Sequence, residues 1–268
     1  MSNYKGPFIG IAGIISQKQI KTIVAKINPD TILGAYIEYR CVMAGILVNS
    51  ETLAGKIIKD KRKNRFPDVN QLSEIFLNHP KILNVVNFYT MDQENLLKDM
   101  LEIAKLGGEN LNGLQLNITW PDTKTIREYK KKFPNHIIIL EFDRDILREN
   151  SPDSLANKIF GKYEGLVDYI VLGLGEEGIS LYVNETAKYL RAIQKKTEIG
   201  LAVTGNIGPG NLLDEITILL KSKGFKDLSF SADFGLLNSE GGLDMKKMAQ
   251  YLRGANRSTT SYHRVKIS

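Results

Sequence analysis

Cysteine and histidine are scarce in this chain of 268 residues, which contains one cysteine, Cys41, and three histidines. A single cysteine cannot form a disulfide within the chain, and the histidines are too widely separated to give the spacing of a metal site. We therefore expect no bound metal, and we predict that the protein works in a reducing compartment, the cytoplasm.

Long hydrophobic runs are also missing. The longest apolar stretches, such as residues 166–174, have roughly half of the ~20 residues that a membrane helix needs. No basic segment at the N-terminus leads into an apolar run, as a secretory signal would. We expect no membrane partner and no export. With 43% hydrophobic and 25% charged residues, the chain has the composition of an ordinary globular domain.

The chain has no excess of negative charge, since 36 Lys and Arg against 30 Asp and Glu give a formal net charge of +6. This balance favours anionic partners in general. The basic residues concentrate in residues 59–65 and 253–266. Neither stretch has aromatic residues interleaved in the manner of a base-stacking platform, so we expect no nucleic-acid partner.

Short apolar runs rich in β-branched residues alternate with longer segments of helical period, which is typical of βαβ units around a parallel sheet. The eight predicted strands are residues 8–12, 42–48, 82–88, 113–118, 137–142, 169–173, 200–204 and 228–232. The predicted helices are residues 17–27, 95–106, 123–133, 184–196, 212–223 and 245–253. Eight units in about 250 residues predict a single (β/α)8 barrel over residues 1–254. The basic tail over 255–268 is expected to be flexible.

An open, doubly wound sheet is the alternative fold. Its dinucleotide-binding form would have G-x-G-x-x-G after the first strand, whereas residues 10–16 read Gly-Ile-Ala-Gly-Ile-Ile-Ser. Residues 173–178 match the pattern but contain two glutamates, which would repel a pyrophosphate.

The loops after the seventh and eighth predicted strands are rich in glycine. In a barrel the active face is built from the loops that follow the strands, and phosphate frequently binds after strands seven and eight. Glycine lets backbone N–H groups approach an anion closely. We predict a phosphate site formed by Gly205, Asn206, Ile207, Gly208, Phe234 and Gly235. The alternative is that these glycines only serve a tight turn before a helix.

Four segments, residues 10–14 (Gly-Ile-Ala-Gly-Ile), 114–117 (Leu-Gln-Leu-Asn), 203–212 and 232–244, together resemble the phosphoribosylanthranilate isomerase family and its ribulose-phosphate-binding barrel relatives. Residues 10–14 are similar to that family's first strand, Lys-Ile-Cys-Gly-Ile, and residues 114–117 to its fourth strand, Val-Gln-Leu-His. Residues 203–212 and 232–244 are similar to its loops after strands seven and eight. The resemblance covers most of the chain and implies a barrel with a phosphate site.

The resemblance fails at the two residues that transfer protons in that family, a cysteine after the first strand and an aspartate after the sixth. Ala12 stands at the cysteine position and Gly173 at the aspartate position. Neither side chain can transfer a proton. The resemblance therefore implies the fold and the phosphate site without the family's reaction.

Glu141 and Asp143 are two carboxylates at the end of the fifth predicted strand. Alternation along the strand sends both to the same side, and neighbouring carboxylates can divide into acid and base roles. We predict that both are catalytic, together with Asn117 on the fourth strand. The alternative is that Asp143 pairs with Arg144 or caps the next helix.

Polar residues near other strand ends are predicted to bind the substrate: Gln115, Asn87, Asn49 and Asp233. Buried amides on the inner face of a barrel need partners, which either they or a ligand supply. Asp233 would repel a phosphate unless it points away, toward a ligand hydroxyl or a positive side chain. The long basic segment over residues 51–70 is either a lid over an acidic ligand or a solvent-facing helix and loop.

Together these features predict a barrel that binds a small phosphorylated metabolite and performs isomerase or lyase chemistry with carboxylates and no cofactor. One alternative is a non-catalytic ligand-binding or assembly barrel that has lost the family's activity. Another is a barrel that binds FMN, because glycine-rich loops do not distinguish one phosphate from another. The sequence predicts neither the substrate nor the oligomeric state.

Overall fold

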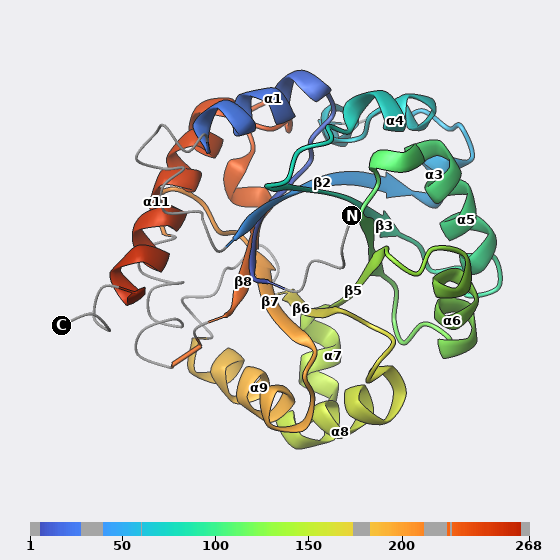
Figure 1. Cartoon of the computed structure of the whole chain (residues 1–268), viewed down its shortest axis with the longest axis vertical. Helices are drawn as coiled ribbons and strands as arrows, with labels where there is room; N and C mark the ends of the chain where they lie inside the picture. The colour runs from blue at the N-terminus through green and yellow to red at the C-terminus, as the bar shows by residue number, and fades with distance from the viewer. Residues whose placement is uncertain are drawn as a thin grey trace.

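Eight parallel strands close into a barrel in the computed structural model, which describes residues 6–27, 40–59, 61–173, 183–211, 224–225 and 227–263 (Figure 1). Each strand pairs with the next along the chain, and β8 pairs with β1. The strands are β1 (Phe8–Ala12), β2 (Cys41–Asn49), β3 (Ile82–Tyr89), β4 (Gly113–Asn117), β5 (Ile137–Phe142), β6 (Tyr169–Gly173), β7 (Gly200–Gly205) and β8 (Ser229–Ala232). The predicted (β/α)8 barrel is confirmed, and the alternative of an open sheet is wrong.

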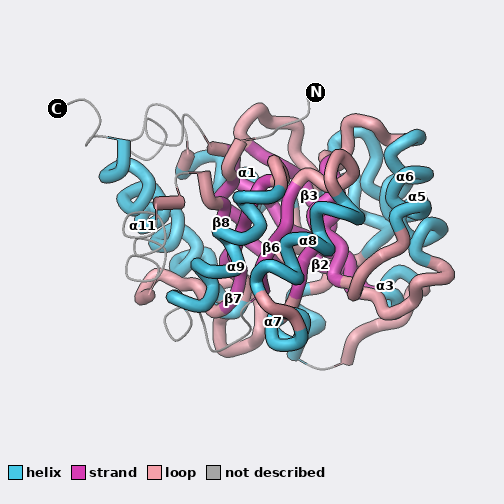
Figure 2. Tube along the Cα trace, turned by 90° about the horizontal axis from the view of Figure 1, so that it is seen from below, coloured by secondary structure: helices cyan, strands magenta, loops and turns pink. Residues whose placement is uncertain are grey.

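Helices form the outer layer around the strands (Figure 2). The α-helices are α1 (Gln17–Lys26), α3 (Ser50–Leu53), α4 (Leu72–Ile75), α5 (Leu96–Gly107), α6 (Thr123–Lys132), α7 (Arg144–Glu149), α8 (Pro152–Tyr163), α9 (Val183–Lys196) and α11 (Met245–His263). The 3-10 helices are η1 (Lys61–Arg65), η2 (Val69–Gln71), η3 (Gly108–Asn110) and η5 (Phe234–Leu236). The helix predicted over 212–223 lies outside the described residues. No helix in the described part of the chain is long and apolar enough to cross a membrane.

The amphipathic pattern of α5 shows how the outer layer packs. Leu96, Met100, Ile103 and Ala104 are buried, and their successive spacings of four, three and one residues form one apolar stripe against the strands. The last helix, α11, continues past residue 254 to His263, so the predicted tail begins within a helix. Flexibility of residues 255–268 stays a prediction.

The barrel interior changes from apolar to polar along its axis. The inward positions nearer the start of the strands form one apolar cluster: Phe8, Cys41, Met43, Leu83, Val85, Ile137, Ile139, Tyr169, Val171 and Ala202. Toward the strand ends, Asn87 pairs in register with Gln115, and Thr204 with Ser231. The apolar cluster fills one end of the barrel and leaves polar side chains at the other.

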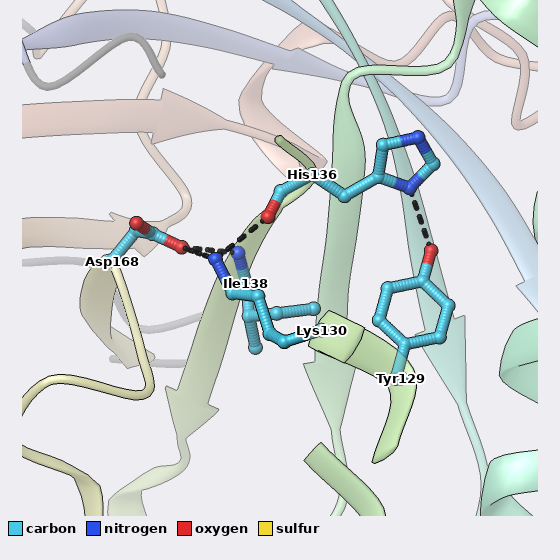
Figure 3. A network of polar contacts seen from close by, with 5 residues as sticks. All are labelled: Tyr129, Lys130, His136, Ile138 and Asp168. Atoms are coloured by element: carbon cyan, nitrogen blue, oxygen red, sulfur yellow. Dashed lines mark hydrogen bonds and ion pairs between the residues drawn. The ribbon is translucent and has the colours of Figure 1, made fainter. Parts of the chain in front are cut away.

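A network of polar contacts connects helix and strand residues at the apolar end of the barrel, where β5 begins (Figure 3). Asp168 Oδ2 accepts hydrogen bonds of 2.8 Å from both Lys130 Nζ and the Ile138 backbone N–H. Tyr129 Oη lies 2.8 Å from His136 Nδ1. Burial, aided by the charge of Lys130, lowers the pKa of His136 to about 4, so this imidazole is neutral at physiological pH. The network joins α6 to β5 and β6 at the end opposite the polar mouth.

Candidate functional site

A cavity of about 270 Å³ opens at the polar end of the barrel, the end where (β/α)8 enzymes carry their active sites. Seven residues predicted from the sequence line it: Asn87, Gln115, Glu141, Asp143, Gly205, Asp233 and Phe234. Tyr89, Thr204 and Ser231 also line it and were not predicted. The volume lies just below the roughly 300–1,000 Å³ typical of ligand pockets, so the cavity has room only for a small ligand.

Glu141, near the end of β5, is held by two amides of the neighbouring strand β4. Its Oε2 atom accepts a hydrogen bond of 2.6 Å from Gln115 Nε2 and one of 2.8 Å from Asn117 Nδ2. Gln115 and Asn117 are two residues apart, so strand alternation places them on the same inner face. The structure therefore brings together three of the predicted site residues.

Burial raises the pKa of Glu141 from its ordinary value of 4.5 to about 7. The hydrogen bonds from Asn117 and Gln115 oppose this rise because they stabilise the carboxylate, whereas the charge of Asp143 adds to it. A carboxyl group that titrates near neutral pH can both donate and accept a proton. A general acid or base needs this property.

Ala12 and Gly173 stand at the two positions where the family resemblance leads us to expect proton-transfer residues. Both residues line the cavity. A Cβ atom built onto Gly173 would lie 2.8 Å from Glu141 Oε1. The Glu141 carboxyl group therefore occupies the space into which a side chain at position 173 would point.

Asp143 both faces the cavity and caps a helix. It lines the cavity, and its Oδ1 also accepts a hydrogen bond of 3.1 Å from the Ile146 backbone N–H at the start of α7. The helix cap that the sequence left as an alternative is present. Glu141 and Asp143 also line the same cavity, as strand alternation predicts.

Three amide oxygens of this wall have no hydrogen-bond partner among the described residues: Asn87 Oδ1, Gln115 Oε1 and Asn117 Oδ1. Asn87 and Gln115 are only 2% and 3% exposed. Gln115 and Asn117 use their N–H groups on Glu141, which fixes the orientation of both amides. The buried amides therefore do not satisfy one another, because their carbonyl oxygens have no hydrogen-bond donor among the described residues.

The predicted phosphate-binding loops lie in direct backbone contact. A Cβ atom built onto Gly208 would lie 2.8 Å from Gly235 O, so glycine is needed for the loops to approach each other. Ile207 is fully buried in the hydrophobic core, and Asn206 is exposed. Ile207 therefore serves packing, and only its backbone is available to an anion.

The Gly208 backbone N–H is already occupied. It donates a hydrogen bond of 2.7 Å to Asn211 Oδ1, and Asn211 Nδ2 donates one of 2.7 Å to Asn206 O. A phosphate contact with Gly208 thus requires Asn211 to release this N–H group. Gly205 and Phe234 are the members of the predicted phosphate site that line the cavity.

Asp233 has a buried cationic partner that sequence reasoning missed. Arg65, the last residue of η1, forms an ion pair with Asp233, and the two side chains are 9% and 13% exposed. The Arg65 guanidinium also lies 5.3 Å from the centre of the Phe234 ring. Arg65 is therefore the positive side chain that Asp233 needs if a phosphate binds nearby.

The basic segment after β2 is solvent-facing in part and packs against the loop after β8 at its end, and its role as a lid over a ligand stays a prediction. Lys56 and Lys63 are exposed to solvent, whereas Arg65 is buried against the loop after β8. Asn64 Nδ2 adds a hydrogen bond of 2.8 Å to Glu240 O. The end of the segment therefore packs over one side of the barrel mouth.

Asn49 lies outside the set of residues that line the cavity and has a structural role. Its Oδ1 accepts a hydrogen bond of 2.8 Å from the Thr52 backbone N–H, and its own N–H donates to Thr52 Oγ1 at 3.0 Å. This reciprocal pair caps the short helix α3. A polar residue at a strand end can cap a helix as readily as it can bind a ligand, and the sequence does not separate the two.

No protein-family model and no curated protein sequence matches the chain. Solved structures do match it. A phosphoribosylanthranilate isomerase from Pyrococcus furiosus is 16% identical, with 94% of this chain and 99% of that one covered and a TM-score of 0.59. The enzyme from Thermus thermophilus is 14% identical, with coverages of 93% and 98% and a TM-score of 0.58.

The α subunit of tryptophan synthase from Legionella pneumophila is also similar in fold. It is 9% identical, with coverages of 96% and 93% and a TM-score of 0.54. Barrels of different function thus lie at comparable structural distance, and identities this low establish the fold alone. The chain has a (β/α)8 barrel fold like that of the phosphoribosylanthranilate isomerases.

Proposed function

We propose that the barrel mouth binds a small phosphorylated metabolite and transfers a proton on it, in an isomerase or lyase reaction. The observation that carries this proposal is the position of Glu141, whose carboxyl group lines the cavity and is held by two amides. Its pKa of about 7 leaves it partly protonated at physiological pH. It can therefore take a proton from one atom of the substrate and return it to another.

The neighbouring residues support this role. Gln115 and Asn117 fix the carboxyl group, and their N–H groups stabilise its ionised form. Asp143, on the same wall, raises the pKa of Glu141 through its negative charge. We assign Glu141 as the acid and base, Asn117 and Gln115 as positioning residues, and Asp143 as a second carboxylate at the site.

The phosphate is proposed to bind at the loops after β7 and β8. Gly205 and Phe234 line the cavity there, and Arg65 neutralises Asp233, which removes the main repulsion. The small volume of the cavity favours a metabolite over a flavin, so we propose no cofactor. A purified protein that shows no flavin absorption band would agree with this.

Incorporation of solvent deuterium tests the proton transfer without a known product. Aldose and ketose phosphates of three to six carbons are incubated with the protein in D₂O, and exchange of C–H for C–D is followed by proton NMR. We expect exchange in at least one compound, and a loss of about a hundredfold or more in Glu141→Gln. Exchange that persists in the variant would show that another group moves the proton.

A non-catalytic binding barrel is the second candidate, favoured by Ala12 and Gly173, which place no titratable group on their parts of the wall. It predicts saturable binding of a sugar phosphate with no deuterium exchange in any compound. The same experiment therefore separates the two functions.

A further inference from the structure

The wall of the cavity formed by β3, β4 and β5 has hydrogen-bond acceptors without donors. Asn87 Oδ1 and Gln115 Oε1 are buried and have no partner among the described residues, and both side chains line the cavity. An unpartnered buried acceptor costs free energy that a ligand N–H group would recover. The terminal torsion of an amide side chain is soft, so the Asn87 amide can adjust to a ligand donor. Gln115 keeps its Nε2 hydrogen bond to Glu141, and its Oε1 is left to accept from the ligand.

The charges at the cavity point to the same kind of ligand. Among the described residues that line it, the carboxylates are Glu141, Asp143, Asp145 and Asp233, and the cation is Arg144. Arg65 neutralises Asp233, and Arg148 pairs with Asp145, so Glu141 and Asp143 are left beside Arg144 on the β5 side. A positive group is therefore favoured on this side of the cavity. On the opposite side, near the loops after β7 and β8, Asp233 is neutralised, so this side does not repel an anion.

We propose that the β3–β5 wall binds a protonated amine of the substrate, which donates to Asn87 Oδ1, Gln115 Oε1 and the Glu141 carboxylate. An ammonium group has three N–H donors and no acceptor, and it meets three acceptors here. The inference rests on the proposed function in using the same cavity for the ligand. It makes the substrate class a small phosphorylated amine, with the amine at the β3–β5 wall and the phosphate toward the loops after β7 and β8.

Three matched probes separate the two ends of such a ligand: 4-aminobutyl phosphate, butyl phosphate and butylamine. Their binding is measured by calorimetry at pH 8, where Glu141 is mostly ionised and the amine is protonated. We expect 4-aminobutyl phosphate to bind at least about tenfold more tightly than butyl phosphate, because charge-assisted hydrogen bonds are the stronger kind.

Two variants remove the acceptors while keeping their volume, Asn87→Leu and Gln115→Met. Each should reduce the preference for the amine to about threefold or less, and the wild-type comparison of probes stands even where a variant folds poorly. Thr186→Val is the matched control, since Thr186 Oγ1 on α9 is also buried with no hydrogen-bond partner among the described residues, and Thr186 is not one of the residues that line the cavity. It should leave the preference unchanged.

The outcomes distinguish failure of this inference from failure of the proposed function. Equal binding of the two phosphates overturns the amine site while the phosphate site stands. Binding of butylamine as tight as that of 4-aminobutyl phosphate supports the amine site and contradicts the phosphate site. If none of the three probes binds, the inference is overturned. It is also overturned if Ca²⁺ or Mg²⁺ binds at the β3–β5 wall in place of the amine.

Discussion

Oε1 of Glu141 lies 2.8 Å from the point at which a side chain on Gly173 would begin. Glu141 is on β5 and Gly173 on β6, and the two strands are paired neighbours. A long acidic side chain on one strand therefore fills the room that glycine leaves on the next. The resemblance to the phosphoribosylanthranilate isomerases leads us to expect an aspartate at position 173, and here Glu141 places a carboxyl group beside that position from the adjacent strand.

Gly173→Ala should disturb this arrangement. The new Cβ atom would press on Glu141 Oε1 and displace it from Gln115 and Asn117, because real Cβ contacts are rarely so short. We expect a loss of about 1–3 kcal/mol in the free energy of unfolding, measured by urea denaturation. The double variant Gly173→Ala/Glu141→Ala should recover about 1 kcal/mol or more relative to the sum of the two single changes.

Gly161→Ala provides the control for that experiment. Gly161 lies within α8, and apart from its chain neighbours and the nearby backbone of the helix, no described atom lies within 4 Å of a Cβ built there. Alanine should stabilise the helix by about 0.5–1 kcal/mol. Strict additivity of the Gly173 and Glu141 changes would mean that the two residues do not share this space.

Glu141 should make stability depend on pH. Its pKa in the folded protein, about 7, is above the ordinary value of 4.5, so the folded state binds the proton more tightly than the unfolded chain. The resulting stabilisation is fully present below about pH 4.5 and is lost as the pH rises through 7. In Glu141→Gln this dependence should be missing. The wild type should therefore lose up to about 3 kcal/mol relative to the variant between pH 4.5 and 8.

Urea denaturation of both proteins across that range is the measurement. Other groups titrate equally in the two proteins, so the difference isolates Glu141. A constant difference would show that Glu141 has an ordinary pKa and would remove the main support for its acid–base role.

The strand pattern and strand alternation were enough to predict the barrel and part of its site. The eight apolar runs gave every strand, and the spacing of Glu141 and Asp143 placed both on the cavity wall. Both features depend on local spacing along one strand, which a sequence displays directly.

The sequence did not predict two kinds of interaction. One kind joins residues far apart in the chain, and in the other a polar side chain could bond either to a ligand or to nearby backbone. Arg65 is one of several basic residues in its segment, and only the folded structure shows that it reaches Asp233. Asn49 and Asn211 have the polarity of ligand-binding residues, but their side chains hydrogen-bond to nearby backbone groups. Residue type does not reveal which use an amide will have.

The buried pair of Arg65 and Asp233 should contribute strongly to stability when one partner is removed. Arg65→Met would leave Asp233 buried without a counter-charge, which we expect to cost about 3–5 kcal/mol. Arg65→Met/Asp233→Leu should recover most of that loss, because an apolar pair of similar volume avoids the desolvation of both charges.

Arg148→Met supplies the comparison, since the ion pair of Arg148 and Asp145 is 60% and 79% exposed. Its loss should change the free energy of unfolding by less than about 1 kcal/mol. Similar small effects for Arg65→Met and Arg148→Met would show that the Arg65 side chain is solvated.

The loops after β7 and β8 give the last prediction, which concerns the phosphate site itself. Inorganic phosphate, titrated to millimolar concentration, should shift the backbone amide NMR signals of Gly205 and Phe234, which line the cavity. Asn211→Ala should lower the dissociation constant about two- to tenfold, because it frees the Gly208 N–H group, which now donates a hydrogen bond to Asn211 Oδ1. Asn150→Ala removes another side-chain hydrogen bond to the backbone, at the end of α7, and should leave phosphate binding unchanged. If the amide signals of Gly205 and Phe234 do not move in the wild type, the glycines of the loops after β7 and β8 serve the close packing of these loops and bind no anion.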